Sequence, residues 1–133
     1  GEKLAALFTP GSHGSTFAGN PLGAAAGLAT LDVIEDENLV ANAEARGEQL
    51  RDGIMATGNP LFVSVRGRGL LDAVELKHPC SHAVMNYCLE HGLIVNAVAP
   101  NALRFAPPLI VTAQDVDQAL AILKDVPTDL PDD

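Results

Sequence analysis

Apolar residues recur at helical spacing in several stretches of the chain. From Leu22 to Ile34 they occur nearly all round the helix and several are very small, which predicts a buried helix closely approached by its neighbours. From Val40 to Ile54 they form one stripe and the charges fall elsewhere, which predicts an amphipathic helix with a solvated charged face, ending at Gly58. The last helix carries a stripe of Val116, Ala119, Leu120 and Leu123.

Between these helices the pattern changes to the alternation that is typical of strands. Two strands are predicted over 61–66 and 70–76, joined at a glycine turn, and two more over 93–95 and 103–105. A short helix from Pro79 to about His91 separates the two pairs. This order of elements predicts an α+β fold with a mainly antiparallel sheet that helices cover on one side.

Local signals mark two helix starts and one loose end. Asn20 offers a side-chain cap, and Pro21 suits the first helical position. Thr112 and Asp115 form a capping box before the last helix. The tail over 127–133, rich in proline and aspartate, is expected to fray.

The composition indicates one compact acidic domain. A chain of 133 residues with 47% hydrophobic content can bury a core. Its net charge of −9 argues against nucleic acid and acidic membrane surfaces as partners, because both need a cationic patch. The first residues do not show the charged-then-apolar pattern of a signal peptide, and no apolar run is long enough to span a bilayer, so a cytoplasmic location is expected. The start at Gly1 instead of Met indicates a fragment.

Cysteines and histidines crowd one segment without the spacing of a metal site. Cys80 and Cys88 are too far apart along a helix for a disulfide and are expected to be buried thiols. The three histidines nearby are not accompanied by a C-x-x-C pair or a second half-site. We therefore expect no metal.

A glycine-rich loop from Gly11 to Gly19 leads directly into the first helix. Amides at a helix start attract anions, and Ser15 and Thr16 add hydroxyl donors, so a phosphate would fit. The loop is not a nucleotide-binding P-loop, because it lacks that motif's lysine. It is not the nucleophile elbow of a hydrolase either, because it lacks the G-x-S-x-G motif. An ordinary tight loop, with His13 as a hydrogen-bonding element, is the alternative.

Arg104 is the second candidate for binding. In its strand, Leu103 and Phe105 face one side and Arg104 the other, and the run that follows carries no charge. An arginine in such apolar surroundings usually has a carboxylate partner, either in a salt bridge within the protein or in a ligand, and both readings stay open. Arg66 and Arg68, beside the glycine turn, are expected to be solvated.

Three runs, in order, resemble the class III aminotransferases and span nearly the whole chain. They are FTPGSHGSTFAGNPL at 8–22, VRGRGL at 65–70 and LRFAPPL at 103–109. Within the family, the sequences of these runs are most similar to those of the acetylornithine aminotransferases, with the ornithine aminotransferases second. The fold that this resemblance implies is the C-terminal small domain of a fold type I transferase dependent on pyridoxal 5'-phosphate, preceded by the inter-domain helix.

The resemblance also implies a division of the chain. Residues 1–19 would be the tail of the large domain with the phosphate-contacting loop, and 20–35 the inter-domain helix. Residues 36–126 would be the small α+β domain, and 127–133 the frayed tail.

The resemblance implies roles for three residues. Thr16 would bind the phosphate of pyridoxal 5'-phosphate held by the other subunit of a homodimer, Ser15 would lie beside the substrate, and Arg104 would bind a substrate carboxylate. The family's cofactor lysine lies upstream of the loop, and Lys3 does not sit in its motif. No catalytic residue is therefore expected in the chain, which alone would be inactive.

The implied reaction moves the δ-amino group of N2-acetylornithine to 2-oxoglutarate, giving glutamate, in arginine biosynthesis. An ornithine or 4-aminobutyrate aminotransferase is the alternative within the family. A different class also remains: a stand-alone, non-catalytic α+β module for ligand binding or dimerisation.

Overall fold

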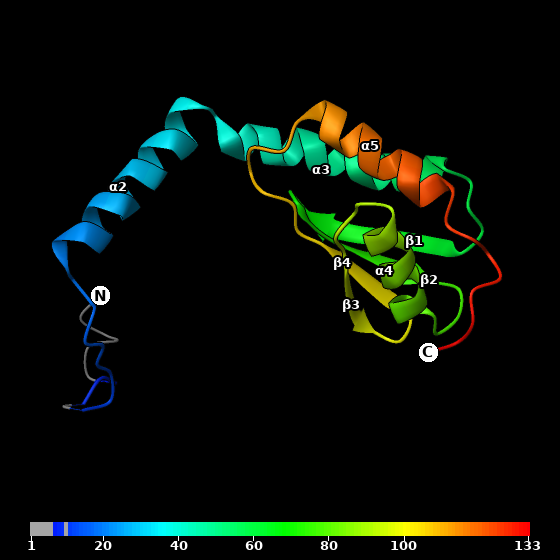
Figure 1. Cartoon of the computed structure of the whole chain (residues 1–133). Coiled ribbons are helices and arrows are strands. Elements are labelled where there is room, and N and C mark those ends of the chain that lie inside the picture. Colours follow the sequence, from blue (N-terminus) through cyan, green and yellow to red (C-terminus); the bar gives the residue numbers. More distant parts are fainter. Residues whose placement is uncertain (1–6, 10) are drawn as a thin grey trace. The chain divides into compact units, whose positions relative to one another are not determined.

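The structure is a computed structural model that describes residues 7–9 and 11–133, and it divides into two compact units that meet between Glu37 and Asn38. The first unit contains helix α2 (Pro21–Asp36). The second contains three helices and four strands: α3 (Leu39–Ala56), β1 (Phe62–Arg68), β2 (Leu71–Leu76), α4 (Ser81–Glu90), β3 (Asn96–Ala99), β4 (Ala102–Phe105) and α5 (Ala113–Lys124) (Figure 1). The prediction of an α+β fold is confirmed.

Both predicted helix starts are confirmed. The side chain of Asn20 accepts a hydrogen bond from the N–H of Gly23 at 2.7 Å, and Pro21 occupies the first turn of α2. Before α5, the Thr112 hydroxyl accepts from the N–H of Asp115 at 3.2 Å. The Asp115 carboxylate in turn accepts from the N–H of Thr112 at 2.9 Å, which completes the capping box.

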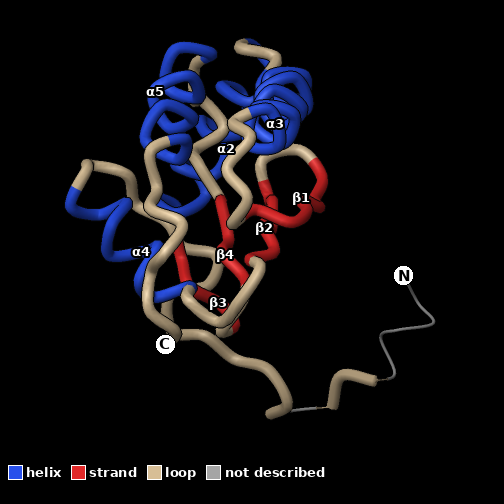
Figure 2. The backbone as a smooth tube through the Cα atoms, turned by 90° about the vertical axis from the view of Figure 1, so that its right-hand side faces the viewer, coloured by secondary structure: helices blue, strands red, loops and turns tan. Residues whose placement is uncertain are grey.

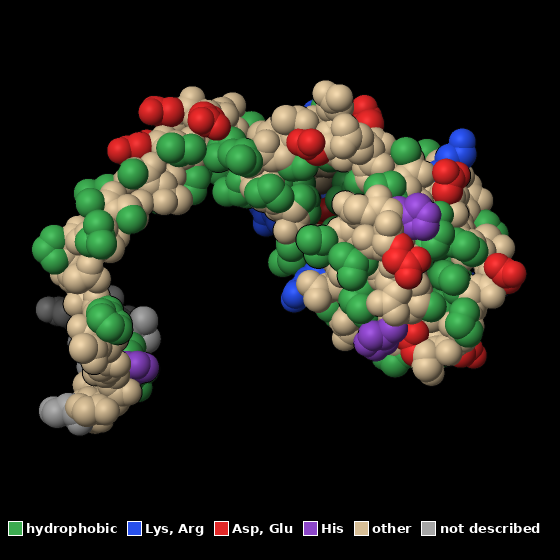
Figure 3. All heavy atoms as spheres, in the orientation of Figure 1, with side chains coloured by type: hydrophobic (Ala, Val, Ile, Leu, Met, Phe, Trp, Pro, Cys, Tyr) green, Lys and Arg blue, Asp and Glu red, His purple; other side chains and the backbone are tan. Residues whose placement is uncertain are grey.

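Helix α2 is not buried, which corrects the expectation for this segment. None of its residues is buried, and hydrophobic side chains are exposed along it (Figure 3). The large ones are Leu22, Leu28, Leu31 and Val33. A helix that is apolar on all sides needs other segments to cover it. The other described residues of its unit form only turns and loop, so nothing in that unit does so.

The four strands form one antiparallel sheet in the order β1-β2-β4-β3 (Figure 2). The glycine turn joins β1 to β2 as predicted, and Gly69 adopts a φ of +57° there. The register pairs Arg66 with Ala73, Ala73 with Arg104, and Arg104 with Asn96. These four residues therefore form one row across the sheet.

Strand β3 lies further along the chain than predicted, at Asn96–Ala99 and not at 93–95. The N–H of Leu93 donates to the carbonyl of Cys88 at 2.8 Å, which ties it to the end of α4. Ile94 is 85% exposed. A short apolar run cannot by itself be assigned to a strand, and here it connects the helix to the strand.

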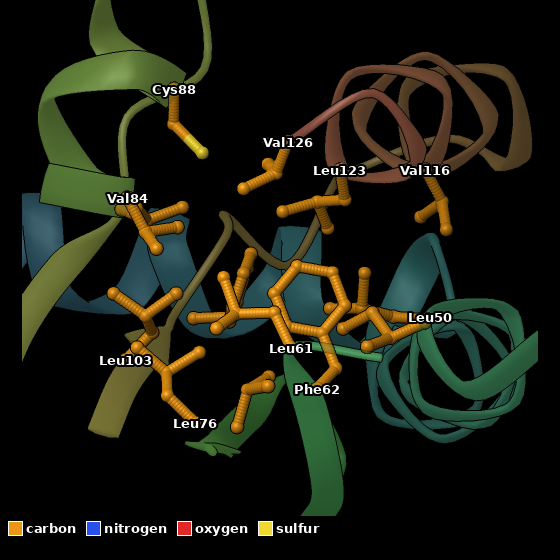
Figure 4. Close-up of a cluster of buried hydrophobic side chains, with 14 of the residues drawn as sticks. Leu50, Leu61, Phe62, Leu76, Val84, Cys88, Leu103, Val116, Leu123 and Val126 are labelled. Atoms are coloured by element: carbon orange, nitrogen blue, oxygen red, sulfur yellow. The ribbon is translucent and has the colours of Figure 1, made fainter. Parts of the chain in front are cut away.

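The hydrophobic core lies between the sheet and helices α3, α4 and α5 (Figure 4). Leu103 and Phe105 of β4 point into it and Arg104 is exposed on the other side, as the alternation predicts. Both cysteines are buried and free, and burial raises the pKa of the Cys88 thiol to about 11. The helices contribute Leu50, Ile54, Val84, Cys88, Val116 and Leu123.

The tail is tied down, which corrects the expectation of fraying over 127–133. The Asp133 carboxylate accepts hydrogen bonds from the N–H groups of His82 at 3.0 Å and Ala83 at 3.3 Å. Cys80, the residue at the N-cap of α4, supplies no side-chain hydrogen bond. Asp133 therefore caps α4 from the other end of the unit's sequence, where the helix dipole favours a negative charge.

Candidate functional site

Arg104 extends from the middle of β4 on the sheet face opposite the three helices. Its Nη2 donates a hydrogen bond to the Oδ1 of Asn96 in β3 at 3.2 Å. Among the described residues it forms no ion pair, so the internal salt bridge considered from the sequence is not found there. The guanidinium therefore keeps its charge and most of its donors for a ligand.

Arg104 borders two hollows. One has a volume of about 370 Å³ and runs from the sheet edge toward α5, with mostly apolar walls that include Leu50, Ile94, Phe105, Pro107 and Val111. The other has a volume of about 590 Å³ and lies over the open sheet face; Arg66, Leu71, Ala73 and Val98 line it. Asp115 also lines the first hollow and Asp72 the second, but Asp115 is bonded to Thr112 and Asp72 is paired with Arg51. Apolar walls with an arginine at the border suit a small organic anion.

The open sheet face is cationic, although the chain as a whole is acidic. Arg66, Arg68 and Arg104 project from it, and Arg66 and Arg68 are exposed as predicted. Glu75 is the one acidic residue that the four strands place on this face. Its Oε2 accepts a hydrogen bond from the Ser64 hydroxyl at 3.0 Å, on the side away from β4.

The glycine-rich loop belongs to the first unit. The Ser12 hydroxyl donates to the carbonyl of Thr9 at 2.7 Å, so it is already used within the loop. The N–H of Ala18 donates to the carbonyl of Ser15 at 3.3 Å and closes a turn. Ser15 and Thr16 are exposed, and their hydroxyls have no hydrogen-bond partner in the part of the chain that the structure describes.

The start of α2 offers fewer donors to an anion than the sequence suggested. Asn20 takes the N–H groups of Gly23 and Ala24, through its side chain and its carbonyl, and Pro21 has no N–H. The donors that remain are mainly those of the Ser15–Ala18 turn. Hydroxyl and amide groups in such a turn fit a phosphate. The His13 ring lies 5.0 Å from that of Phe8, centroid to centroid.

Asn96 is a polar contact that the sequence did not reveal. Asn96 is the first residue of β3, and the β3–β4 register places it opposite Arg104, which allows the two side chains to form a hydrogen bond. That register includes an irregularity between Ala97 and Ala99, which no local pattern announces.

No three histidine, cysteine, aspartate or glutamate side chains of the described residues gather into a group that could hold a metal ion. None of the helices in the described ranges combines the length and the hydrophobicity needed to cross a membrane.

Comparisons with known proteins give a consistent result. The family model described as "Aminotransferase class-III" matches residues 1–126. The acetylornithine aminotransferase of Gloeobacter violaceus is 45% identical over 133 residues, which cover 98% of this chain and 33% of that protein. The ornithine aminotransferase of Staphylococcus carnosus is 46% identical over 123 residues, 90% of this chain and 30% of that protein.

A solved structure shares the fold. The ornithine aminotransferase of Toxoplasma gondii, described with partial occupancy of PLP at its active site, matches with a TM-score of 0.79 and 35% identity. The match covers 92% of this chain and 30% of that one. The chain thus spans about a third of the length of the relatives it matches.

Proposed function

Because the chain belongs to the class-III aminotransferase family, we propose that it forms the C-terminal third of an acetylornithine aminotransferase. The proposed reaction transfers the δ-amino group of N2-acetylornithine to 2-oxoglutarate, in arginine biosynthesis in the cytoplasm. Pyridoxal 5'-phosphate is the cofactor expected for this family, and when bound it supplies the electron sink that transamination needs.

The observation that carries this proposal is the state of Arg104. Its exposed guanidinium borders two hollows, has one neutral hydrogen-bond partner and forms no ion pair within the described residues. A planar guanidinium binds a carboxylate through two parallel hydrogen bonds, which fixes both the position and the orientation of the ligand. Arg104 would hold a carboxylate of glutamate or 2-oxoglutarate in this way.

The glycine-rich loop supports the cofactor half of the proposal. In the proposed homodimer, the exposed Thr16 hydroxyl would donate to the phosphate of the cofactor held by the other subunit, and Ser15 would lie beside the substrate. Hydroxyl and amide donors suit this role, because they can hydrogen-bond to a phosphate dianion and their own charge does not change with pH. The exposed apolar side chains of α2 are consistent with an inter-domain helix that other parts of the enzyme cover.

The test uses the complete enzyme that contains this chain, loaded with cofactor. Arg104→Lys keeps the charge and loses the planar fork, so we expect the KM for 2-oxoglutarate to rise about tenfold, as for one charge-assisted hydrogen bond. Arg68→Lys, on the same sheet face, is the matched control and should leave KM unchanged. An unchanged KM in Arg104→Lys would reject Arg104 as the carboxylate ligand.

Kinetic assays on the same complete enzyme identify the preferred amino donor. N2-acetylornithine should give the highest kcat/KM when it is compared with ornithine and 4-aminobutyrate at saturating 2-oxoglutarate. A preference for ornithine would favour the alternative that the relative from Staphylococcus carnosus represents.

A further inference from the structure

The hydrogen bond between Arg104 and Asn96 joins two neighbours in one row of the sheet. The two residues are direct partners in the β3–β4 register, and their side chains lie on the open face. Arginine only donates hydrogen bonds, so the amide oxygen of Asn96 must be the atom that faces it. Asn96 thereby fixes the direction in which the guanidinium points along the face.

Asn96 is also a neutral partner. A carboxylate at this position would form an ion pair with Arg104 and would compete with any anionic ligand. The asparagine amide oxygen accepts a hydrogen bond from one of the five N–H groups of the guanidinium, and because the amide is neutral the positive charge of Arg104 is not compensated.

The acidic residue that the four strands place on this face is held by another partner. Glu75 of β2 lies diagonally across from Arg104, at a spacing that long side chains can bridge. Its carboxylate instead accepts from Ser64 of β1, and it makes no ion pair with Arg104. Within the residues that the structure describes, Arg104 thus has a neutral hydrogen-bond partner on the β3 side and no ion pair on the β2 side.

We propose that Asn96 is a positioning residue for substrate binding, which orients the Arg104 guanidinium toward a dicarboxylate while offering it a neutral partner. This inference rests on the proposed function, because it requires Arg104 to bind the substrate carboxylate. Asn96 itself does not have to touch the substrate.

The experiment compares Asn96→Ala and Asn96→Asp in the complete, cofactor-loaded enzyme. Loss of the amide should raise the KM for 2-oxoglutarate roughly three- to tenfold, as expected for one partly solvated hydrogen bond to a charged group, with kcat within about twofold of wild type. The aspartate should raise KM further, at least about tenfold above the alanine variant, because it neutralises the arginine. Asn86→Ala, an exposed asparagine of α4, is the matched control.

A second measurement does not depend on turnover. Glutarate is an unreactive five-carbon dicarboxylate, and its dissociation constant can be measured by calorimetry on the same variants and on Arg104→Gln. The dissociation constants should rank in the same order as the KM values, and the thermal unfolding midpoints of all variants should agree. Glu75→Gln should bind glutarate like wild type, because Ser64 already holds this side chain away.

The outcomes separate the two claims. If Arg104→Gln weakens glutarate binding but neither Asn96 variant does, the positioning role is overturned and the proposed function stands. If Asn96→Asp binds no more weakly than Asn96→Ala, the charge argument is overturned. If Arg104→Gln itself binds glutarate like wild type, both the proposed carboxylate site and this inference are rejected.

Discussion

The Nη1 of Arg51 in α3 lies 2.9 Å from the Oδ1 of Asp72 in β2, and the same nitrogen donates to the carbonyl of Gly69 at 3.0 Å. One side chain thus holds both the start of β2 and the turn before it. Asp72 is 1% exposed, and its Oδ2 has no hydrogen-bond partner within residues 7–9 and 11–133. Burial raises the pKa of Asp72, while the hydrogen bond and the charge of Arg51 act in the opposite direction.

Removing the arginine should therefore destabilise the fold. In Arg51→Met the buried carboxyl of Asp72 loses its partner, and we expect a loss of about 3 kcal/mol, at the lower end for buried pairs because Arg51 is 21% exposed. Urea unfolding of the chain at pH 7 measures this loss. Arg68→Met is the control, with an expected change within about 0.5 kcal/mol. Equal midpoints for the two variants would contradict the role of the pair.

The same turn packs so closely on α3 that one helical glycine has no room for a side chain. A Cβ added at Gly47 would collide with the carbonyl of Gly69, whereas a Cβ added at Gly27 in α2 meets nothing. Gly→Ala in a helix normally stabilises it by about 1 kcal/mol. For Gly27→Ala we expect this stabilisation of α2, seen as a higher helix content by circular dichroism. For Gly47→Ala we expect the protein to lose roughly 2 kcal/mol of its free energy of unfolding in urea. A stabilising Gly47→Ala would show that the turn can move away.

The cap that Asp133 provides to α4 should depend on pH. Desolvation raises the pKa of Asp133, but the hydrogen bonds from His82, Ser81 and Ala83 outweigh it and lower the pKa to about 2. A carboxyl with a lowered pKa in the folded state stabilises the protein above its unfolded value of 3.8, and this contribution is lost as the pH falls toward 2.

The measurement compares urea midpoints of wild type and Asp133→Asn at several pH values. The variant should be less stable at pH 7 and should approach wild type near pH 2. Asp129→Asn, an exposed aspartate of the same tail, should match wild type throughout. A difference for Asp133→Asn that stays constant with pH would argue against the charged cap.

The loop of the first unit offers a matched pair of hydroxyl deletions. Thr16→Ala in the complete enzyme should raise the dissociation constant of pyridoxal 5'-phosphate, by roughly tenfold for one hydrogen bond to a phosphate. Ser12→Ala should have a smaller effect, because that hydroxyl is used by Thr9. Cofactor retained after dialysis can be read from its absorbance. Equal retention in Thr16→Ala and wild type would reject the phosphate role.

The features that the sequence predicts correctly depend on residues that are close to one another along the chain. The caps at Asn20 and Thr112 need only residues three positions away, and both are confirmed. The direction of Arg104 follows from the alternation of one strand between Leu103 and Phe105. Each depends on a backbone geometry that is the same in every protein.

The features that sequence missed depend on distant partners. The solvated charged face that the sequence predicts over 40–54 includes Arg51, because nothing near it in sequence announces the buried Asp72. The sequence predicts a frayed tail, because the helix that Asp133 caps lies far back in the chain. The contact of Asn96 with Arg104 requires the cross-strand register. In all three, a polar group finds its partner only after the sheet and helices have assembled.

The open sheet face has a kinetic consequence for any anion that approaches. Three of the eight basic residues, Arg66, Arg68 and Arg104, share this face on a chain with a net charge of −9. We expect this face to attract an approaching dianion more than the rest of the acidic chain does, so that electrostatic steering would favour encounters near Arg104. Added salt would slow capture more than it slows release.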